Sequence, residues 1–326
     1  MSPMSPLRII FMGTARLACA SLEALTRESG FVVAAVVTQP DRPKGRALHP
    51  QPPPVKECAL AAKLPVMQPL RAREEKFIEE LRGLQPDLIV VAAYGQILPQ
   101  SILDIPRFGC LNVHTSLLPK YRGAAPIQWA ILEGESETGV TIMKMDAGLD
   151  TGAMLTQQTT PIGAEDDAQT LHDRLAQLGA GLLAPTIRDL VAGKITPRPQ
   201  PAEGASHARK LTKEDGRLDW NLPARVLWNR IRALTPWPGA FTHLPDQPQP
   251  HLLKIWRAEV VPGSGAAGEI LQADGTGIVV ACGQEALRVL ELQREGGRRM
   301  SPGEFLTGHR LTPGANLMAA DRAPGQ

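Results

Sequence analysis

The segment Leu7–Gly13 reads LRIIFMG, a run of apolar residues that ends at a glycine. Two further runs, Phe31–Thr38 (FVVAAVVT) and Pro86–Ala93 (PDLIVVAA), are similarly apolar and rich in β-branched residues. Strands that are apolar along their length are buried on both faces, which is typical of a parallel sheet covered by helices on both sides. We expect Cys110–His114 (CLNVH) and Val140–Met145 (VTIMKM) to add a fourth and a fifth strand to this sheet.

The segments between these runs have helical periodicity. Glu74–Arg82 (EEKFIEELR) is amphipathic. A second stretch places five apolar residues on one helical stripe: Leu171, Leu175, Leu178, Leu182 and Ile187. Strands that alternate with helices over the first part of the chain predict an open, doubly wound, Rossmann-like α/β domain.

The pattern changes after this domain. Thr196–Ala205 (TPRPQPAEGA) is rich in proline and small residues, as linkers are. Beyond it, a helix at Ala224–Ala233 and several short strands separated by glycine and proline predict a smaller β-barrel domain. The expected strands are Leu252–Val260, Gly268–Gln272, Gly277–Ala281 and Leu287–Leu292. We therefore expect a first domain at 1–195, a linker at 196–209, a second domain at 210–320 and a tail at 321–326.

Composition restricts the class of protein. The chain has 326 residues, of which 43% are hydrophobic and 21% charged, and a length of this order suggests two domains. A net charge of +2 argues against a strongly basic nucleic-acid coat. The four cysteines have no C-x-x-C pairing, and the sequence contains neither a membrane-spanning apolar run nor a secretory signal. We expect a cytoplasmic enzyme without a membrane partner.

Two polar residues, Asn112 and His114, follow one another on the fourth expected strand. Residues two apart on a strand point to the same face, and ligands of open α/β sheets bind at the carboxyl ends of the strands. The pair is therefore a candidate site. A core histidine hydrogen-bonded to an asparagine would give the same pattern.

Acidic residues and a proline-containing loop follow nearby strands. Asp146 and Asp150 both lie in MDAGLDTG, where a carboxylate could orient a histidine or only cap a turn. The loop Ser116–Pro119 (SLLP) could offer backbone groups to a flat ligand or could pack against the sheet. The turn after Gly13 lacks the glycines of a dinucleotide-binding loop, which argues against a hydride-transfer cofactor.

Taken together, the motifs resemble the methionyl-tRNA formyltransferase family over nearly the whole chain. The similar segments are LRIIFMGT at Leu7, TQPDRPKGR at Thr38, AAYGQILP at Ala92, NVHTSLLPKYRGAAPIQWAI at Asn112, ETGVTIMKMDAGLDTG at Glu137, KLTKEDGRLDW at Lys210 and IRALTPWPG at Ile231. One departure is the turn Gly13–Ala18 (GTARLA), where the family usually has a proline and an aromatic residue.

The resemblance implies transfer of a formyl group from 10-formyltetrahydrofolate to the α-amino group of methionine on initiator tRNA, without a metal. It implies that Asn112, His114 and Asp150 are catalytic, and that the folate is bound by Ser116, Leu117, Leu118 and Pro119. It also implies an OB-like second domain that contacts tRNA. A monomer is expected.

The loop Thr38–His49 is basic, and the resemblance implies that it meets the acceptor end of the tRNA. The expected tRNA-binding residues are Arg42, Lys44, Arg46 and Lys210. A basic loop can also be only solvated, but arginine suits both phosphate and base contacts.

Three alternatives remain at this stage. Formyltransferases that act on a glycinamide ribotide or on an amino sugar nucleotide could share the Asn-x-His and Gly-Leu-Asp elements. A tRNA-binding protein without catalysis would not need Asn112, His114 and Asp150. An NAD-dependent enzyme is disfavoured by the missing glycines.

Overall fold

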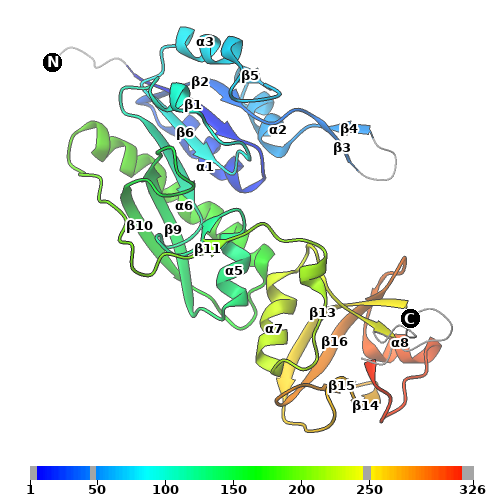
Figure 1. Ribbon diagram of the computed structural model, residues 1–326. Helices are drawn as coiled ribbons and strands as arrows, with labels where there is room; N and C mark the ends of the chain where they lie inside the picture. The colour runs from blue at the N-terminus through cyan, green and yellow to red at the C-terminus, as the bar shows by residue number, and fades with distance from the viewer. Residues whose placement is uncertain (1–5, 45–48, 245–250, 318–326) are drawn as a thin grey trace, which may run out of the picture. The chain divides into compact units, whose positions relative to one another are not determined.

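The structure, a computed structural model, describes residues 6–44, 49–244 and 251–317 (Figure 1). Its internal contacts divide the chain into two compact units. Unit 1 consists of Met1–Pro126, Glu137–Pro161 and His172–Ala208, and unit 2 of Ile127–Ser136, Ile162–Leu171 and Arg209–Gln326. Two short segments that interrupt unit 1 in sequence, 127–136 and 162–171, therefore belong to the same unit as the C-terminal residues. None of the helices in the described ranges is long and apolar enough to cross a membrane.

Unit 1 is built on a seven-stranded sheet, and its α/β architecture agrees with the sequence. The strand order is β10 (Met154–Pro161), β9 (Glu137–Lys144), β7 (Cys110–His114), β6 (Leu88–Ala92), β1 (Leu7–Gly13), β2 (Phe31–Val37) and β5 (Val66–Met67). The pairs from β7 through β5 are parallel. Ile9, Ile10, Phe11 and Met12 of β1 are fully buried, as an apolar central strand requires.

The strand expected at Val140–Met145 is present as β9, but the prediction that it is parallel is wrong. β9 runs antiparallel to β7, and β10 runs antiparallel to β9. A parallel neighbour needs a crossover connection that returns the chain to the opposite end of the strands. The chain instead passes from the end of β7 through α5 (Pro126–Leu132) and enters β9 beside the end it has just left.

Helices cover both faces of this sheet. Ile10 and Met12 pack in one apolar cluster with Phe77 and Leu81 of α3 (Glu75–Gly83), the helix expected at Glu74–Arg82. On the opposite face, Gly13 lies close to Ala18 of α1 (Leu17–Arg27). The remaining helices of the unit are α2 (Pro54–Ala61), α4 (Gln100–Leu103) and most of α6 (Ala168–Val191).

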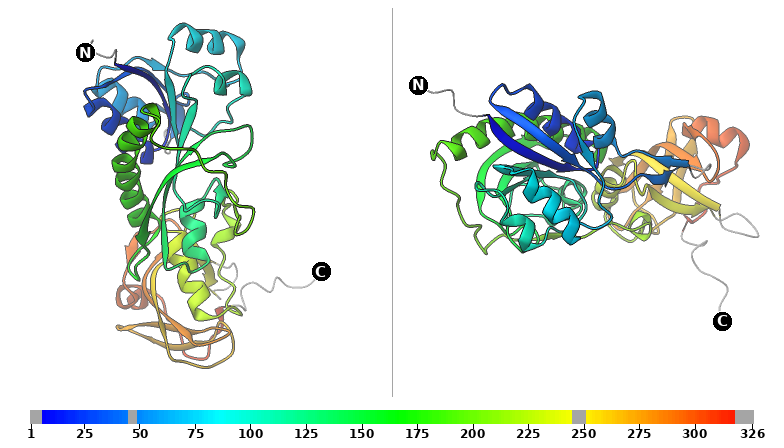
Figure 2. Two further views of the ribbon diagram at one scale, coloured as in Figure 1. Left: turned by 90° about the vertical axis from the view of Figure 1, so that its left-hand side faces the viewer. Right: turned by 90° about the horizontal axis from the view of Figure 1, so that it is seen from above.

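The long helix α6, drawn in green, lies along β7 and β9 (Figures 1 and 2). A Cβ on Gly179 would come within 2.8 Å of Val113 and 3.5 Å of Val140, so the helix and the sheet are in close contact there. Because side chains alternate along a strand, Asn112 and His114 point to the face opposite Val113. The helix continues through Pro185 instead of ending before it.

Unit 2 contains a six-stranded antiparallel sheet. Its order is β12 (Ala240–Leu244), β13 (His251–Val261), β16 (Ala286–Arg294), β15 (Gly277–Ala281) and β14 (Ile270–Asp274), with β17 (Arg299–Met300) also paired to β16. Over the described parts of the unit, β12 and β14 stand at the two ends of this order without a pairing between them. The pairing therefore establishes an antiparallel sheet, and the β-rich second domain agrees with the sequence.

The core of unit 2 lies between this sheet and two helices, α7 (Ala224–Ala233) and α8 (Pro302–Gly308). Leu227 and Ile231 of α7 pack with Trp220 and Ile255, and Phe305 of α8 is fully buried in the same cluster. Burial of side chains of this size supplies the main favourable free energy of a small domain.

Candidate active site

The site is built at the end of β7. Leu111 and Val113 point to one face of the sheet, while Asn112 and His114 share the other face with the buried Cys110. His114 is only 5% exposed, and Asn112 is half-buried. The strand therefore presents an amide and an imidazole side by side at its carboxyl end.

Asp150 reaches this pair from the loop that follows β9. Its Oδ1 accepts a hydrogen bond from Asn112 Nδ2 at 3.2 Å, and its Oδ2 lies 3.7 Å from His114 Nδ1. Oδ2 also accepts from the Gly123 N–H at 2.9 Å. The structure thus brings together the three residues that the sequence proposed as a group.

Asp146, the alternative acid, is engaged elsewhere. Its Oδ1 accepts from the Gly148 N–H at 3.0 Å and from Thr151 Oγ1 at 2.7 Å. These bonds stabilise the turn at residues 146–151, so Asp146 has the turn-capping role that the sequence left open for an aspartate in this loop.

The His114 ring has a defined tautomer. Nε2 lies 2.9 Å from the carbonyl oxygen of Tyr121, and because a carbonyl can only accept, Nε2 must carry the proton. In the neutral ring Nδ1 then has the free lone pair, and it faces Asp150. Nδ1 is therefore the ring atom that can take up or release a proton.

The position of Asp150 depends on residues that the sequence analysis did not single out. Asp150 has φ +54°, in the left-handed region that few non-glycine residues adopt. Gln200 Nε2 donates to the carbonyls of Asp150 and Gly152, both at 2.8 Å. Gln200 Oε1 in turn accepts two hydrogen bonds from the Arg122 guanidinium, at 2.8 and 3.0 Å.

The segment 196–209, expected as a linker, is thus part of the wall of the site. Besides Gln200, it contributes Ser206 Oγ, which accepts from the Tyr121 N–H at 2.9 Å. It also forms β11 (His207–Ala208), which pairs in parallel with β8 (Arg122–Gly123). Proline-rich composition correctly indicated irregular backbone there, but composition contains no signal for these long-range contacts.

Gly123 allows the close approach of these two short strands. Its φ is +117°, which favours glycine, and a Cβ would come within 2.7 Å of the Ala208 carbonyl oxygen. The same residue supplies the N–H that holds Asp150.

The expected folate loop, Ser116–Pro119, packs against the sheet through Thr141 of β9. Thr141 Oγ1 donates to the Ser116 carbonyl at 2.7 Å and accepts from the Leu118 N–H at 3.1 Å. Gln157 Nε2 donates to the Leu118 carbonyl at 2.9 Å, and Ser116 Oγ donates to the Lys120 carbonyl at 2.6 Å. Leu117 and Pro119 are half-buried. The conformation of the loop is therefore held by hydrogen bonds from the protein itself.

The basic loop contains a short hairpin of β3 (Arg42–Lys44) and β4 (His49–Gln51). Arg42 is exposed, and its Nη2 donates to Gln39 Oε1 at 3.3 Å. Arg46 lies outside the described residues. Lys210 is exposed in unit 2.

Gly13 permits the tight turn from β1 into α1. A Cβ there would lie 2.8 Å from Phe11, 2.9 Å from Ala18 and 3.1 Å from the Ala92 carbonyl. Glycine is needed because α1 starts directly against the strand.

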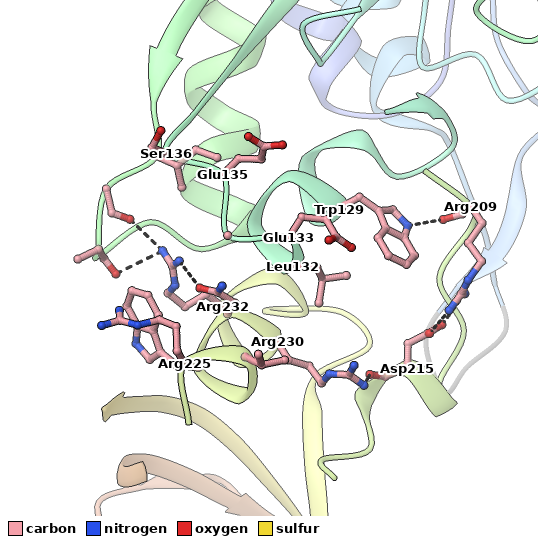
Figure 3. Close-up of a pocket in the computed structure, with 17 residues that line it drawn as sticks. Trp129, Leu132, Glu133, Glu135, Ser136, Arg209, Asp215, Arg225, Arg230 and Arg232 are labelled. Atoms are coloured by element: carbon pink, nitrogen blue, oxygen red, sulfur yellow. Dashed lines mark hydrogen bonds and ion pairs between the residues drawn. The ribbon is translucent and has the colours of Figure 1, made fainter. Parts of the chain in front are cut away.

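A cavity of about 750 Å³ lies in unit 2, apart from these residues (Figure 3). Three of the four arginines that line it, Arg209, Arg230 and Arg232, bind other groups of the chain. Arg209 pairs with Asp215, Arg230 donates to the Asp215 and Arg217 carbonyls, and Arg232 donates to the Gly163 and Asp166 carbonyls. The arginines therefore brace the cavity walls, and the candidate active site is the cluster at β7.

Family models of two kinds match the chain. One described as formyl transferase covers residues 7–187, and one described as formyl transferase, C-terminal domain, covers residues 210–310. Together they span most of both units.

Curated relatives match along almost the whole length. The chain is 52% identical to the methionyl-tRNA formyltransferase of Citrifermentans bemidjiense, over 99% of this chain and 100% of the relative. It is 51% identical to that of Geobacter sulfurreducens, over 96% and 98% of the two chains.

Solved structures share the fold at low identity. HypX from Aquifex aeolicus in complex with tetrahydrofolic acid has a TM-score of 0.61 and 18% identity, over 93% of this chain and 48% of that one. The N-formyltransferase of Helicobacter canadensis in complex with folinic acid and dTDP-3-aminofucose has a TM-score of 0.61 and 18% identity, over 87% and 99%.

Proposed function

The chain belongs to the methionyl-tRNA formyltransferase family, and from that premise we propose that it formylates initiator methionyl-tRNA. The formyl group of 10-formyltetrahydrofolate is transferred to the α-amino group of the esterified methionine, in translation initiation. The observation that carries this proposal is about 50% identity to relatives of that name along nearly the full length of both chains.

The chemistry requires three events. The amine attacks the formyl carbon, the resulting tetrahedral intermediate places negative charge on the formyl oxygen, and the bond to the folate nitrogen breaks. The attacking nitrogen loses a proton and the leaving nitrogen gains one, so protons balance. A site for this reaction needs a hydrogen-bond donor for the oxyanion and a group that can move a proton.

Asn112 is the candidate oxyanion donor. Its amide uses one N–H on Asp150 and has a second to offer to the developing charge. Loss of such a donor costs on the order of 100- to 1000-fold in turnover in other enzymes.

His114 and Asp150 are the candidate proton-transfer pair. The Nε2–H of His114 is bonded to the Tyr121 carbonyl, so Nδ1, which lies beside the Asp150 carboxylate, is the ring atom that takes up and releases the transferred proton. The carboxylate stabilises the protonated ring and accepts from the attacking amine.

The remaining binding roles follow from the family. Ser116, Leu117, Leu118 and Pro119 bind the folate co-substrate, and their preformed loop supports this because a fixed loop loses little entropy on binding. Arg42, Lys44, Arg46 and Lys210 contact the tRNA, supported by the exposure of Arg42 and Lys210. The second domain is OB-like, and the protein acts as a cytoplasmic monomer without a metal.

The reaction is tested by incubating the purified protein with 10-formyltetrahydrofolate and either initiator or elongator methionyl-tRNA. Formylmethionine on the initiator alone is the expected result. An amino sugar nucleotide and glycinamide ribotide are assayed beside them, and formylation of either of these in place of tRNA would overturn the proposal.

A further inference from the structure

We propose that Asp41, Lys56 and Gln68, here called the hairpin clamp, are positioning residues that aim the β3–β4 hairpin and so present Arg42 to the tRNA. The clamp lies at the root of the hairpin, directly before Arg42. This inference rests on the proposed function, since it names what orients the tRNA-binding hairpin.

Within the hairpin clamp, Lys56 and Gln68 bind the Asp41 carboxylate from two sides. Lys56 Nζ donates to both carboxylate oxygens of Asp41 at 2.8 Å, and Gln68 Nε2 donates to Oδ1 at 2.7 Å. Lys56 belongs to α2, and Gln68 directly follows β5. Both arms therefore stand on regular elements of unit 1, so the carboxylate is fixed relative to the sheet.

Gln68 extends the clamp to the preceding backbone. The same Nε2 donates to the Gln39 carbonyl at 2.9 Å. The Gln39 side chain then accepts from Arg42 Nη2 at 3.3 Å. The Gln68 amide thus binds both Gln39 and Asp41 in the short connection from β2 to the hairpin. Gln39, held in this way, in turn orients Arg42.

A second set of bonds ties this connection to the carboxyl ends of two other strands. The Gln39 N–H donates to Thr14 Oγ1 at 3.3 Å, and Thr14 Oγ1 donates to the Tyr94 carbonyl at 2.8 Å. Thr14 follows β1 and Tyr94 follows β6. The hairpin root is therefore fixed to the carboxyl ends of the parallel strands, where Asn112 and His114 also lie.

Charge and burial favour a positioning role over a stabilising one. The side chains of Asp41 and Lys56 are 32% and 22% exposed, and ion pairs near the surface contribute little to folding. A hairpin with three residues in each strand is too short to keep a fixed orientation relative to the sheet without further contacts. Hydrogen bonds from Gln68 and Lys56 lower the pKa of Asp41, so the carboxylate stays charged at neutral pH. Fixing the root in advance reduces the entropy lost when tRNA binds.

The test compares steady-state kinetics of Asp41→Asn, Lys56→Met and Gln68→Glu with the wild-type protein. We expect the KM for initiator methionyl-tRNA to rise by roughly 3- to 30-fold, as for loss of a preorganised contact. The KM for 10-formyltetrahydrofolate and the melting temperature should not change. Glu23→Gln, which breaks the exposed Arg27–Glu23 pair of α1, is the matched control and should match wild type.

Two double variants separate positioning from general damage. Gln68→Glu places two carboxylates together and removes the donor to the Gln39 carbonyl. Adding Asp41→Asn removes the repulsion but does not restore the bond to Gln39, so the KM for tRNA should recover only in part. In an Arg42→Ala background, Asp41→Asn should have no further effect, because the clamp acts through that arginine.

The outcomes distinguish the two proposals. Clamp variants that formylate with an unchanged KM for tRNA, or that lose folate and tRNA use equally, overturn the clamp alone. A wild-type protein that formylates neither tRNA overturns the proposed function and, with it, the role of the clamp.

Discussion

At the residue scale, the polar groups around β7 are of two kinds: those that position Asp150 and those that we propose take part in the reaction. Asp150 accepts from the Gly123 N–H with the same oxygen that faces His114, and its backbone carbonyl is held by Gln200. The carboxylate is thus positioned by groups other than Asn112 and His114. A substitution that keeps the contacts with Gly123 and Gln200 and removes the charge tests the proposed role of the carboxylate.

Asp150→Asn is the substitution that does this. The carboxamide oxygen can still accept from the Gly123 N–H, but the variant loses the charge opposite His114 and also the acceptor for Asn112 Nδ2. We expect turnover to fall by about 100- to 10,000-fold, the range of a general acid–base contribution. Single-turnover formylation and circular dichroism measure chemistry and folding separately. Near-normal turnover in a folded variant would withdraw the carboxylate's role.

Tyr94 provides a prediction about stability. It is 2% exposed, and its hydroxyl has no hydrogen-bond partner among the residues that the structure describes. A buried unpaired hydroxyl costs on the order of 1 kcal/mol, so Tyr94→Phe should unfold at the same or at a higher denaturant concentration. A clear loss of stability would mean that the hydroxyl is satisfied.

The same residue predicts an alkaline effect. Burial raises the pKa of Tyr94 to about 12, above its usual value of 10.0. The unfolded chain therefore releases the phenolic proton first, and the stability that this group contributes below pH 10 is lost as the pH rises toward 12. Tyr94→Phe should lose less stability than wild type between these pH values, as measured by unfolding titrations at each pH.

At the element scale, α8 begins with a complete capping box. Ser301 Oγ accepts from the Glu304 N–H at 3.3 Å, and Glu304 Oε2 accepts from the Ser301 N–H at 2.9 Å. The helix is short and has Phe305 in the core, so its start matters for unit 2. Ser301→Ala should cost about 1 kcal/mol of unfolding free energy. Ser301→Asp, which can also cap, should restore it.

The cap also predicts a pH dependence. Hydrogen bonds from Arg298 and Ser301 lower the pKa of Glu304 to about 2, from 4.5. A lowered carboxyl pKa stabilises the fold above 4.5, and this contribution is lost as the pH falls toward 2. Glu304→Gln should flatten that part of the stability curve. An unchanged slope would show that other carboxyl groups dominate acid unfolding.

At the scale of the whole molecule, a chain segment does not always belong with its sequence neighbours. Residues 162–171 join unit 2, and Arg232 is a main reason. Its Nη1 donates to the Gly163 and Asp166 carbonyls, both at 2.9 Å, and the guanidinium stacks 3.7 Å from the Trp228 ring centre. Burial among these groups lowers the pKa of Arg232.

Arg232→Ala should therefore destabilise unit 2 by about 2–4 kcal/mol, because two carbonyls lose a charged donor. Arg225 is a matched control: it is exposed and lies 4.9 Å from the same Trp228 ring. Arg225→Ala should unfold like wild type in a thermal scan. Equal losses in the two variants would assign the effect to the ring contact and not to the carbonyls.

The sequence by itself determined the local structure and predicted which residues would form the site. The periodicity of apolar residues placed β1, β6, α7 and β15, since burial on two faces or on one stripe leaves a local pattern. The spacing along β7 indicated Asn112 and His114, and the family resemblance added Asp150, which the structure places beside them.

The tertiary structure alone decided the contacts between distant segments. It set the direction of β9, placed Gln200 of the expected linker against the Asp150 carbonyl, and joined residues 163–166 to Arg232. Each of these depends on a hydrogen bond or a pairing between residues far apart in sequence. Such partners are selected by the geometry of the packed chain, and a local pattern of residue types contains no record of them.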